Sequence, residues 1–194
     1  MCQFYSFFNI YIIISLRPGN CPHITFENTV IPHTNVVKYL GLLFDRRLIW
    51  GPHLKTKRKQ INSRLHILRP LMKSNMYISN RLLLYKSLLQ PIWLYGIALW
   101  GTAKPSNTRT IQALQAICLR MIAKAPWYVT NVALHNDLQI PTIKQTAIKY
   151  YLCLHFNMEH YSNTLITQLH TNALPSNPAR HLKREWPRNL LNTY

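Results

Sequence analysis

Carboxylates that could bind catalytic metal ions are few and widely spaced in this sequence. Only five acids occur among 194 residues, and no two of them lie within ten residues of each other. A two-metal centre for phosphoryl transfer needs clustered carboxylates that hold its ions about 4 Å apart. Folding could bring two distant acids together, but the count favours no catalytic residue, no bound metal and no other cofactor. The acids are Glu27, Asp45, Asp137, Glu159 and Glu185.

Cysteine and histidine offer one alternative metal site, around Cys153, His155 and His160. Zinc modules normally have two tight ligand pairs, whereas this group is one loose cluster in an expected helix, so ordinary packing is favoured. The four cysteines contain no Cys-x-x-Cys pair. Two disulfides are possible, but a reducing intracellular compartment is the simpler interpretation, with nucleus and cytoplasm both open.

Positive charge is the dominant feature of the composition. Twenty-three Lys and Arg residues give a net charge of +18 and a pI near 10.2. A surface that repels itself this strongly indicates a polyanionic partner, which is most often nucleic acid, with an anionic membrane surface second. The hydrophobic fraction of 48% is ordinary for a folded protein, and 194 residues suffice for one domain or one domain with a tail.

The basic residues gather after a turn at Trp50, Gly51 and Pro52. From there an apolar stripe at helical spacing predicts a helix that ends at Arg69 and Pro70. Such a charged face is usually only solvated, but no acid occurs between Asp45 and Asp137, which favours phosphate contact. The stripe is Leu54, Ile61, Leu65 and Leu68, and the charges around it are Lys55, Lys57, Arg58, Lys59 and Arg64.

A strand is expected directly before this helix, over residues 36–44, with Gly41 marking a bulge or a close approach of another backbone. The strand ends at Asp45, and Arg46 and Arg47 follow. Residues 21–31 predict a hairpin that turns at Glu27 and Asn28. Together these strands predict a small sheet that needs a helical layer to cover it. Nucleic-acid backbone is expected where the apolar strand meets the basic helix.

The ends of the chain differ from its middle. Residues 4–16 are apolar and could be a strand, a buried helix or sequence foreign to the domain, but they lack the features of a signal peptide. From residue 172 the composition changes to a basic tail that could add nonspecific phosphate attraction. The expected division is residues 1–20, a β element over 21–50, a helical bundle over 51–171 and the tail over 172–194.

Residues 79–101 predict a core helix that begins with Ser79 or Asn80 as cap and kinks near Pro91. It is apolar on nearly every side, so a membrane helix is the alternative, but Lys86, Gln90 and Pro91 oppose it. The aromatic residues Trp93, Tyr95 and Trp100 are expected in the core.

Further helices are expected over residues 108–125, 130–138, 142–161 with Pro141 in the first turn, and 163–170. The triplet His135, Asn136 and Asp137 is expected to be a polar helix end.

Several spaced motifs together resemble the end of the reverse transcriptase, an RNA-directed DNA polymerase, of jockey-type non-LTR retrotransposons, which are transposable elements. The resemblance covers about residues 21–190. It rests on Cys21-Pro22, Asn28, Ile31-Pro32, Val37-Lys38-Tyr39-Leu40-Gly41, Asp45-Arg46-Arg47-Leu48, Trp50 and His53. It continues with Leu84-Tyr85-Lys86, Pro91-Ile92-Trp93, Tyr95-Gly96, Leu99-Trp100-Gly101, Leu119-Arg120-Met121-Ile122, Ala125-Pro126-Trp127-Tyr128-Val129, Leu134-His135, Asp137-Leu138, Ile140-Pro141 and Leu182-Lys183-Arg184.

This resemblance implies a primer-grip region at the edge of a palm, followed by a thumb that holds the template–primer duplex. Lys38, Tyr39, Leu40 and Gly41 would then lie near the primer terminus. Charge and position add Arg46, Arg47, Lys55, Lys57, Arg58 and Lys59 as further nucleic-acid contacts. The expected fold is mainly α, with a small antiparallel β element followed by a thumb-like helical bundle.

The sequence departs from that family because it contains no Asp-Asp pair, which the family's polymerase centre carries in an aromatic-x-Asp-Asp motif. The expectation is therefore a noncatalytic fragment that binds RNA–DNA hybrid or duplex and has no membrane partner. Three alternatives remain: one part of a split polymerase whose palm and fingers are encoded separately, a stand-alone interaction protein, or a decayed gene product.

Overall fold

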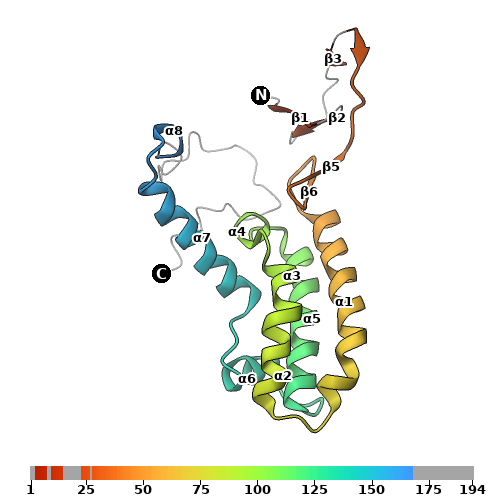
Figure 1. The fold of residues 1–194 in the computed structure, drawn as a ribbon, viewed down its shortest axis with the longest axis vertical. Helices are drawn as coiled ribbons and strands as arrows, with labels where there is room; N and C mark the ends of the chain where they lie inside the picture. Colours follow the sequence, from red (N-terminus) through yellow and green to blue (C-terminus); the bar gives the residue numbers. More distant parts are fainter. Residues whose placement is uncertain (1–2, 8–9, 15–22, 27, 168–194) are drawn as a thin grey trace.

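The structure is a computed structural model that describes residues 3–7, 10–14, 23–26 and 28–167. Most of these residues are helical, and the strands lie near one end of the helical layer (Figure 1). The sequence-based expectation of a mainly α fold with a small antiparallel β element is confirmed. The basic tail over 172–194 lies outside the described residues, as does Glu27 in the expected hairpin turn.

The described strands form three antiparallel pairs. The apolar N-terminal segment contributes β1 (Gln3–Phe7) and β2 (Ile10–Ile14), so it is a pair of strands and not a helix. The expected hairpin is present but short, with β3 (Thr25–Phe26) paired to β4 (Thr29–Val30). The N–H of Tyr11 donates to the carbonyl of Pro32 at 3.3 Å, and Thr34 donates back to Tyr11 at 3.1 Å, which connects β2 to the chain before the third pair.

The third pair corrects the expectation of one continuous strand over residues 36–44. The chain turns back on itself between β5 (Val36–Tyr39) and β6 (Leu42–Asp45), and Tyr39 faces Leu42 in the register. The two turn residues, Leu40 and Gly41, have φ angles of 46° and 76°. Positive φ at both central residues is the geometry of the type I′ turn, whose twist matches that of the flanking strands. Gly41 therefore marks a hairpin turn, not a bulge.

Helix α1 (Gly51–Lys73) begins where the sequence predicted, directly after Trp50, with Pro52 in its first turn. The predicted apolar stripe is buried along its whole length. The prediction that the helix ends at Pro70 is wrong, because one further turn continues to Lys73. Proline removes one N–H from the helical ladder, but Met72, beyond it, is 0% exposed. Its burial in the core stabilises the last turn.

The predicted helix over 79–101 is divided into several shorter segments. These are α2 (Ile78–Leu84), a π-helical turn η1 (Tyr85–Leu89), α3 (Gln90–Leu94) and α4 (Ile97–Trp100). The π turn ends two residues before Pro91, which fits the expected kink because Pro91 cannot donate to the ladder. Tyr77 is at the cap position and no side chain caps the helix there, so the prediction of Ser79 or Asn80 as cap is wrong.

The remaining helices follow the predicted order with shifted bounds. Helix α5 (Pro105–Ala123) starts three residues earlier than expected, and Ile117 on it is 48% exposed. Thr130 caps α6 (Asn131–Asp137) by accepting the N–H of Ala133. Helix α7 (Ile143–Glu159) begins after Thr142, which forms a capping box with Gln145. Pro141 precedes this cap, so the prediction of Pro141 in the first turn is wrong. The short α8 (Thr164–Thr167) follows it.

One contiguous apolar cluster runs from β6 through α1, η1, α3, α4 and α5 to the start of α7. Trp100 and Leu119 are 0% exposed and Trp93 is 2% exposed, so two of the three predicted core aromatics are confirmed. Tyr95 is 51% exposed, and its prediction as a core residue is wrong. Of the helices described here, none is long and apolar enough to cross a membrane.

Candidate nucleic-acid interface

One flank of α1 carries exposed polar and basic side chains along the full length of the helix. At 3.6 residues per turn, seven such positions fall within an arc of about 100° beside the buried stripe. All seven are exposed, and five of them are Lys or Arg. We call this surface the α1 basic flank. It consists of Lys55, Arg58, Lys59, Asn62, His66, Arg69 and Lys73.

Three of the predicted contact residues therefore share one surface, namely Lys55, Arg58 and Lys59. The sequence-based prediction did not include Arg69, although it lies within the predicted helix, and it missed Lys73 because it ended the helix at Pro70. Helical spacing from Lys55 finds Arg69 and, continued past Pro70, also finds Lys73. From Lys55 to Lys73 the flank is about 27 Å long at 1.5 Å per residue, which is about eight base-pair steps of 3.4 Å.

Lys57 lies apart from this flank, on the side of α1 that faces the hairpin. It is partly buried, and its Nζ lies 5.4 Å from the ring centroid of Tyr95. Burial lowers the pKa of the Lys57 ammonium from its ordinary value. A cation over an aromatic ring in this arrangement is held by the ring's quadrupole, so Lys57 is engaged in a structural contact with Tyr95.

The four predicted primer-grip residues lie on β5 and its turn. Lys38 is exposed, Leu40 is 68% exposed, and Tyr39 is 39% exposed. The Tyr95 hydroxyl donates a hydrogen bond to the Leu40 carbonyl, which ties the tip of the hairpin to the helical layer. The structure thus connects the hairpin tip to Lys57 through Tyr95. No pattern in the sequence indicates this role for Tyr95, since its neighbours are apolar.

Arg46 and Arg47 follow β6 in a turn that Asp45 organises. The Asp45 carboxylate is 7% exposed and accepts the N–H groups of Ile49 and Trp50 at 3.1 and 2.7 Å. Arg47 is exposed and Arg46 is half-buried. Because both Asp45 oxygens are occupied by the backbone, this acid acts as a turn residue. It sets the direction in which the chain enters α1.

The three acids within the described residues belong to three different elements. Asp45 ends β6, Asp137 ends α6 and Glu159 ends α7. In the described part of the chain no group of three or more His, Cys, Asp or Glu side chains could hold a metal ion. Cys153 is exposed on α7 and Cys118 is buried in α5. Burial raises the pKa of the Cys118 thiol to about 12.

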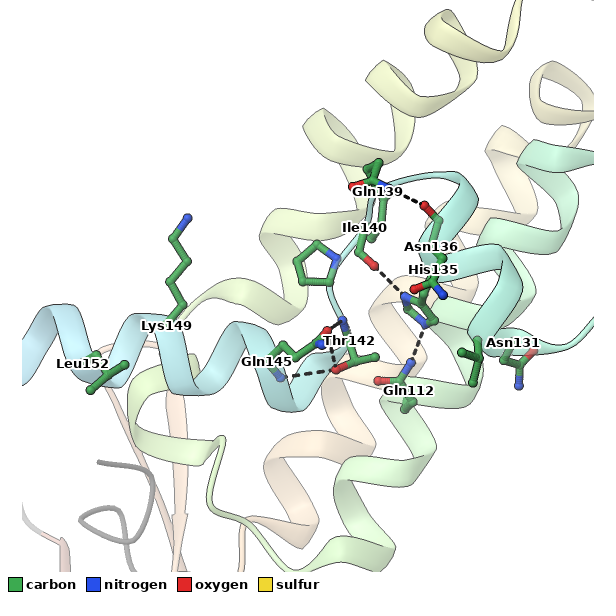
Figure 2. A pocket seen from close by; sticks show the side chains of 12 residues that line it. Gln112, Asn131, His135, Asn136, Gln139, Ile140, Thr142, Gln145, Lys149 and Leu152 are labelled. Atoms are coloured by element: carbon green, nitrogen blue, oxygen red, sulfur yellow. Dashed lines mark hydrogen bonds between the residues drawn. The ribbon is translucent and has the colours of Figure 1, made fainter. Parts of the chain in front are cut away.

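A polar hollow of about 930 Å³ lies between α5, α6 and the start of α7 (Figure 2). His135 joins its walls: Nδ1 donates to the Ile140 carbonyl at 2.7 Å, and Nε2 accepts from the Gln112 amide at 2.9 Å. The Gln112 oxygen in turn accepts the N–H of Ile143 at 2.9 Å. Both ring nitrogens of His135 are thus used in connecting three helices, which confirms its prediction as part of a polar helix end.

Comparison with known proteins gives relatives of one kind. A stretch of 182 residues is 33% identical to the probable RNA-directed DNA polymerase from transposon X-element of Drosophila melanogaster, covering 93% of this chain and 20% of the relative. A stretch of 173 residues is 35% identical to the probable RNA-directed DNA polymerase from transposon BS of the same species, covering 88% and 18%. The RNA-directed DNA polymerase from mobile element jockey of Drosophila melanogaster is 30% identical over 183 residues, covering 91% and 20%.

The chain is therefore related to the RNA-directed DNA polymerases of transposons. More narrowly, it corresponds to a region of the reverse transcriptases of jockey-type non-LTR retrotransposons. It spans about a fifth of the length of the curated relatives that it matches. No protein-family model matches the sequence, and no solved structure matches it.

Proposed function

We propose that this region grips the template–primer duplex of a retrotransposon reverse transcriptase through backbone phosphates, as a primer grip and thumb, and does not polymerise by itself. The observation that carries the proposal is the α1 basic flank. Its five cations lie on one exposed surface, and none of the described acids lies on α1. A row of Lys and Arg without acids is the electrostatic footprint of phosphate binding.

The hairpin of β5 and β6 is a second observation that supports the same proposal. Its exposed tip carries Lys38 and is fixed against the helical layer by Tyr95. A rigid tip next to the first turns of a basic helix could hold the primer strand while the flank follows the duplex. Arg46, Arg47 and Lys57 remain proposed contacts, with Lys57 the weakest of them because it is engaged with the Tyr95 ring.

The first test is the salt dependence of binding to an RNA–DNA hybrid. If four to six phosphates are engaged, log affinity against log salt has a slope of about −3.5 to −5.5. A slope near zero would contradict an electrostatic grip. Binding is measured by fluorescence anisotropy with a labelled hybrid of about 12 base pairs, which is longer than the flank.

A matched pair of triple variants tests whether the proposed grip lies on α1. Lys55→Gln, Arg58→Gln and Lys59→Gln together should weaken hybrid binding and make the salt slope shallower by about 3. The control removes three exposed charges elsewhere: Lys86→Gln, Arg109→Gln and Lys144→Gln. Both variants have the same net charge, so a difference between them measures position. Equal losses would show that only total charge matters.

A second candidate function, one part of a split polymerase, is favoured by exposed apolar residues on the strand pairs. Phe26 is 63% exposed and Val30 is 61% exposed, on the facing strands β3 and β4. Apolar strand edges are normally covered, and a palm and fingers portion could cover these. Primer extension with and without a separately expressed palm and fingers portion distinguishes the two cases. Extension by this chain alone would overturn both.

A further inference from the structure

A short aromatic loop extends from the helical layer between α5 and α6. Trp127 is 88% exposed and Tyr128 is 71% exposed, and their rings meet edge to face with centroids 6.1 Å apart. Trp50, Trp93 and Trp100 are at most 3% exposed. We call residues 126–129 the aromatic loop. We propose that it is a stacking site for the bases of single-stranded nucleic acid.

The loop is held in place by one arginine. Arg120 Nη1 donates to the carbonyls of Pro126 and Trp127 at 2.7 and 3.2 Å. Its Nη2 donates to the carbonyl of Val129 at 2.9 Å and to Asn131 Oδ1 at 3.0 Å. Four hydrogen bonds from one guanidinium order the backbone on both sides of the two rings. The rings are therefore presented to solvent from a fixed backbone, which lowers the ordering cost of a stacked ligand.

A basic hollow of about 520 Å³ adjoins the aromatic loop. Among the described residues its lining contains three cations and no acid: Lys73 from the end of α1, Arg120 from α5, and Lys124 directly after α5. Ala125, which immediately precedes the loop, also lines it. Phosphates in the hollow would place the attached bases within reach of the rings. Proteins that bind single-stranded nucleic acid without sequence preference combine a positively charged groove with aromatic rings on which the bases stack.

The positive charge of the hollow favours nucleic acid over a protein surface as its occupant. The buried centres of protein–protein interfaces are depleted in lysine, whereas two lysines and an arginine line this hollow. Lys73 is also the last residue of the α1 basic flank, so the cationic surface continues from the flank to the loop. A strand that leaves the duplex at the end of the flank would meet the loop there. This inference goes beyond the proposed duplex grip and is tested with a different ligand.

The test uses fluorescein-labelled (dT)8 and an abasic octamer of the same charge, with the whole chain at constant salt. Trp127→Ala should weaken the affinity for (dT)8 by at least about fivefold. Its affinity for the abasic octamer should equal that of wild type, and its affinity for the hybrid should change by less than twofold. Trp127→Phe keeps a ring and should retain most of the affinity, whereas Trp127→Leu should not. Phe156→Ala, at an exposed position on α7, is the control for loss of a surface aromatic ring.

A direct signal comes from tryptophan fluorescence in a Trp186→Phe background. Trp127 is then the exposed indole among otherwise buried ones, and (dT)8 should quench it while the abasic octamer does not. Equal affinity of wild type and Trp127→Ala for (dT)8 would overturn the inference, as would equal quenching by both octamers. Failure of the duplex grip would instead appear as loss of salt-dependent hybrid binding with the Trp127 effect on (dT)8 intact.

Discussion

The Tyr95 hydroxyl donates a 2.5 Å hydrogen bond to the carbonyl oxygen of Leu40, which lies 55 residues earlier in the chain. The same ring lies close to Gly41, where an added Cβ would be 3.4 Å from Tyr95 Cε1. Lys57 approaches the ring as well, at 5.4 Å from its centroid. Tyr95 thus joins the tip of the β5–β6 hairpin to the first turns of α1. The geometry of the proposed primer grip depends on this contact.

Tyr95→Phe removes the hydroxyl and keeps the ring. The free energy of unfolding should fall by about 0.5–1.5 kcal/mol, the usual net worth of one hydrogen bond. Amide hydrogen exchange should accelerate in β5 and β6 before it does so in α5, because the hairpin loses its connection to the helices. Tyr77→Phe, at a position that is 82% exposed, is the control and should change neither quantity. Uniform acceleration across the fold would contradict a local role.

Gly101→Ala should destabilise the packing between α4 and α7. A Cβ at residue 101 would lie 2.5 Å from the Cβ of Ala147 and 2.6 Å from the Ile97 carbonyl oxygen. Relieving such overlap in a packed core costs about 1–3 kcal/mol, seen as a lower free energy of unfolding in urea. Gly51→Ala is the matched control, since among the described residues its Cβ would meet the Asn107 amide nitrogen alone, at an ordinary 3.6 Å. Equal stability of Gly101→Ala and wild type would contradict the close approach.

The burial of α1 could be predicted from sequence because its apolar residues repeat at one helical period over the whole helix. The hairpin of β5 and β6 could not, because its turn begins at Leu40, an apolar residue with φ of 46°. Leucine carries no turn signal, and the tertiary contact from Tyr95 supports the conformation. The extension of α1 beyond Pro70 and the exposure of Tyr95 were missed for the same reason. Each depends on contacts with residues distant in the chain.

The candidate site was partly predictable for a related reason. The basic residues after residue 54, with their helical spacing, predict the exposed cationic face of α1 without any structure. The aromatic loop gives a weaker signal, since Trp127 and Tyr128 follow Pro126 and look like a helix break. What identifies the loop as a rigid platform is Arg120, whose four acceptors come from a segment that begins six residues later. No periodicity or motif in one sequence indicates that arrangement.

The two described cysteines should differ in reactivity. Cys118 is 1% exposed and its thiol has a pKa raised to about 12 by burial, whereas Cys153 is exposed. Thiolate is the reactive form, so in a Cys2→Ser and Cys21→Ser background only Cys153 should react with a thiol reagent at pH 8. Cys118 should react after unfolding in denaturant. Cys153→Ser is the control, and rapid native labelling of that variant would contradict the burial of Cys118.

From the burial of His53 we predict how the free energy of unfolding depends on pH. It is 1% exposed, and its Nδ1 accepts the N–H of Leu43 at 3.3 Å, so the neutral ring carries its proton on Nε2. Burial and then the charge of Lys57 lower its pKa from 6.5 to about 4. Between these two values the unfolded chain binds a proton that the folded chain does not. The contribution of His53 to stability is therefore complete above pH 6.5, falls as the pH decreases and levels off below pH 4.

The measurement is the free energy of unfolding in urea at intervals from pH 7.5 to pH 4. A shift of this size corresponds to a loss on the order of 2–3 kcal/mol across that range. His53→Gln keeps an acceptor for Leu43 but cannot titrate, so its stability should fall less between pH 6.5 and pH 4 than that of wild type. His66→Gln, at an exposed position on the same helix, is the control for replacing a histidine of α1 with glutamine. If His53→Gln follows the wild-type profile, another histidine carries the dependence, and His53 is protonated in the folded chain as readily as in the unfolded one.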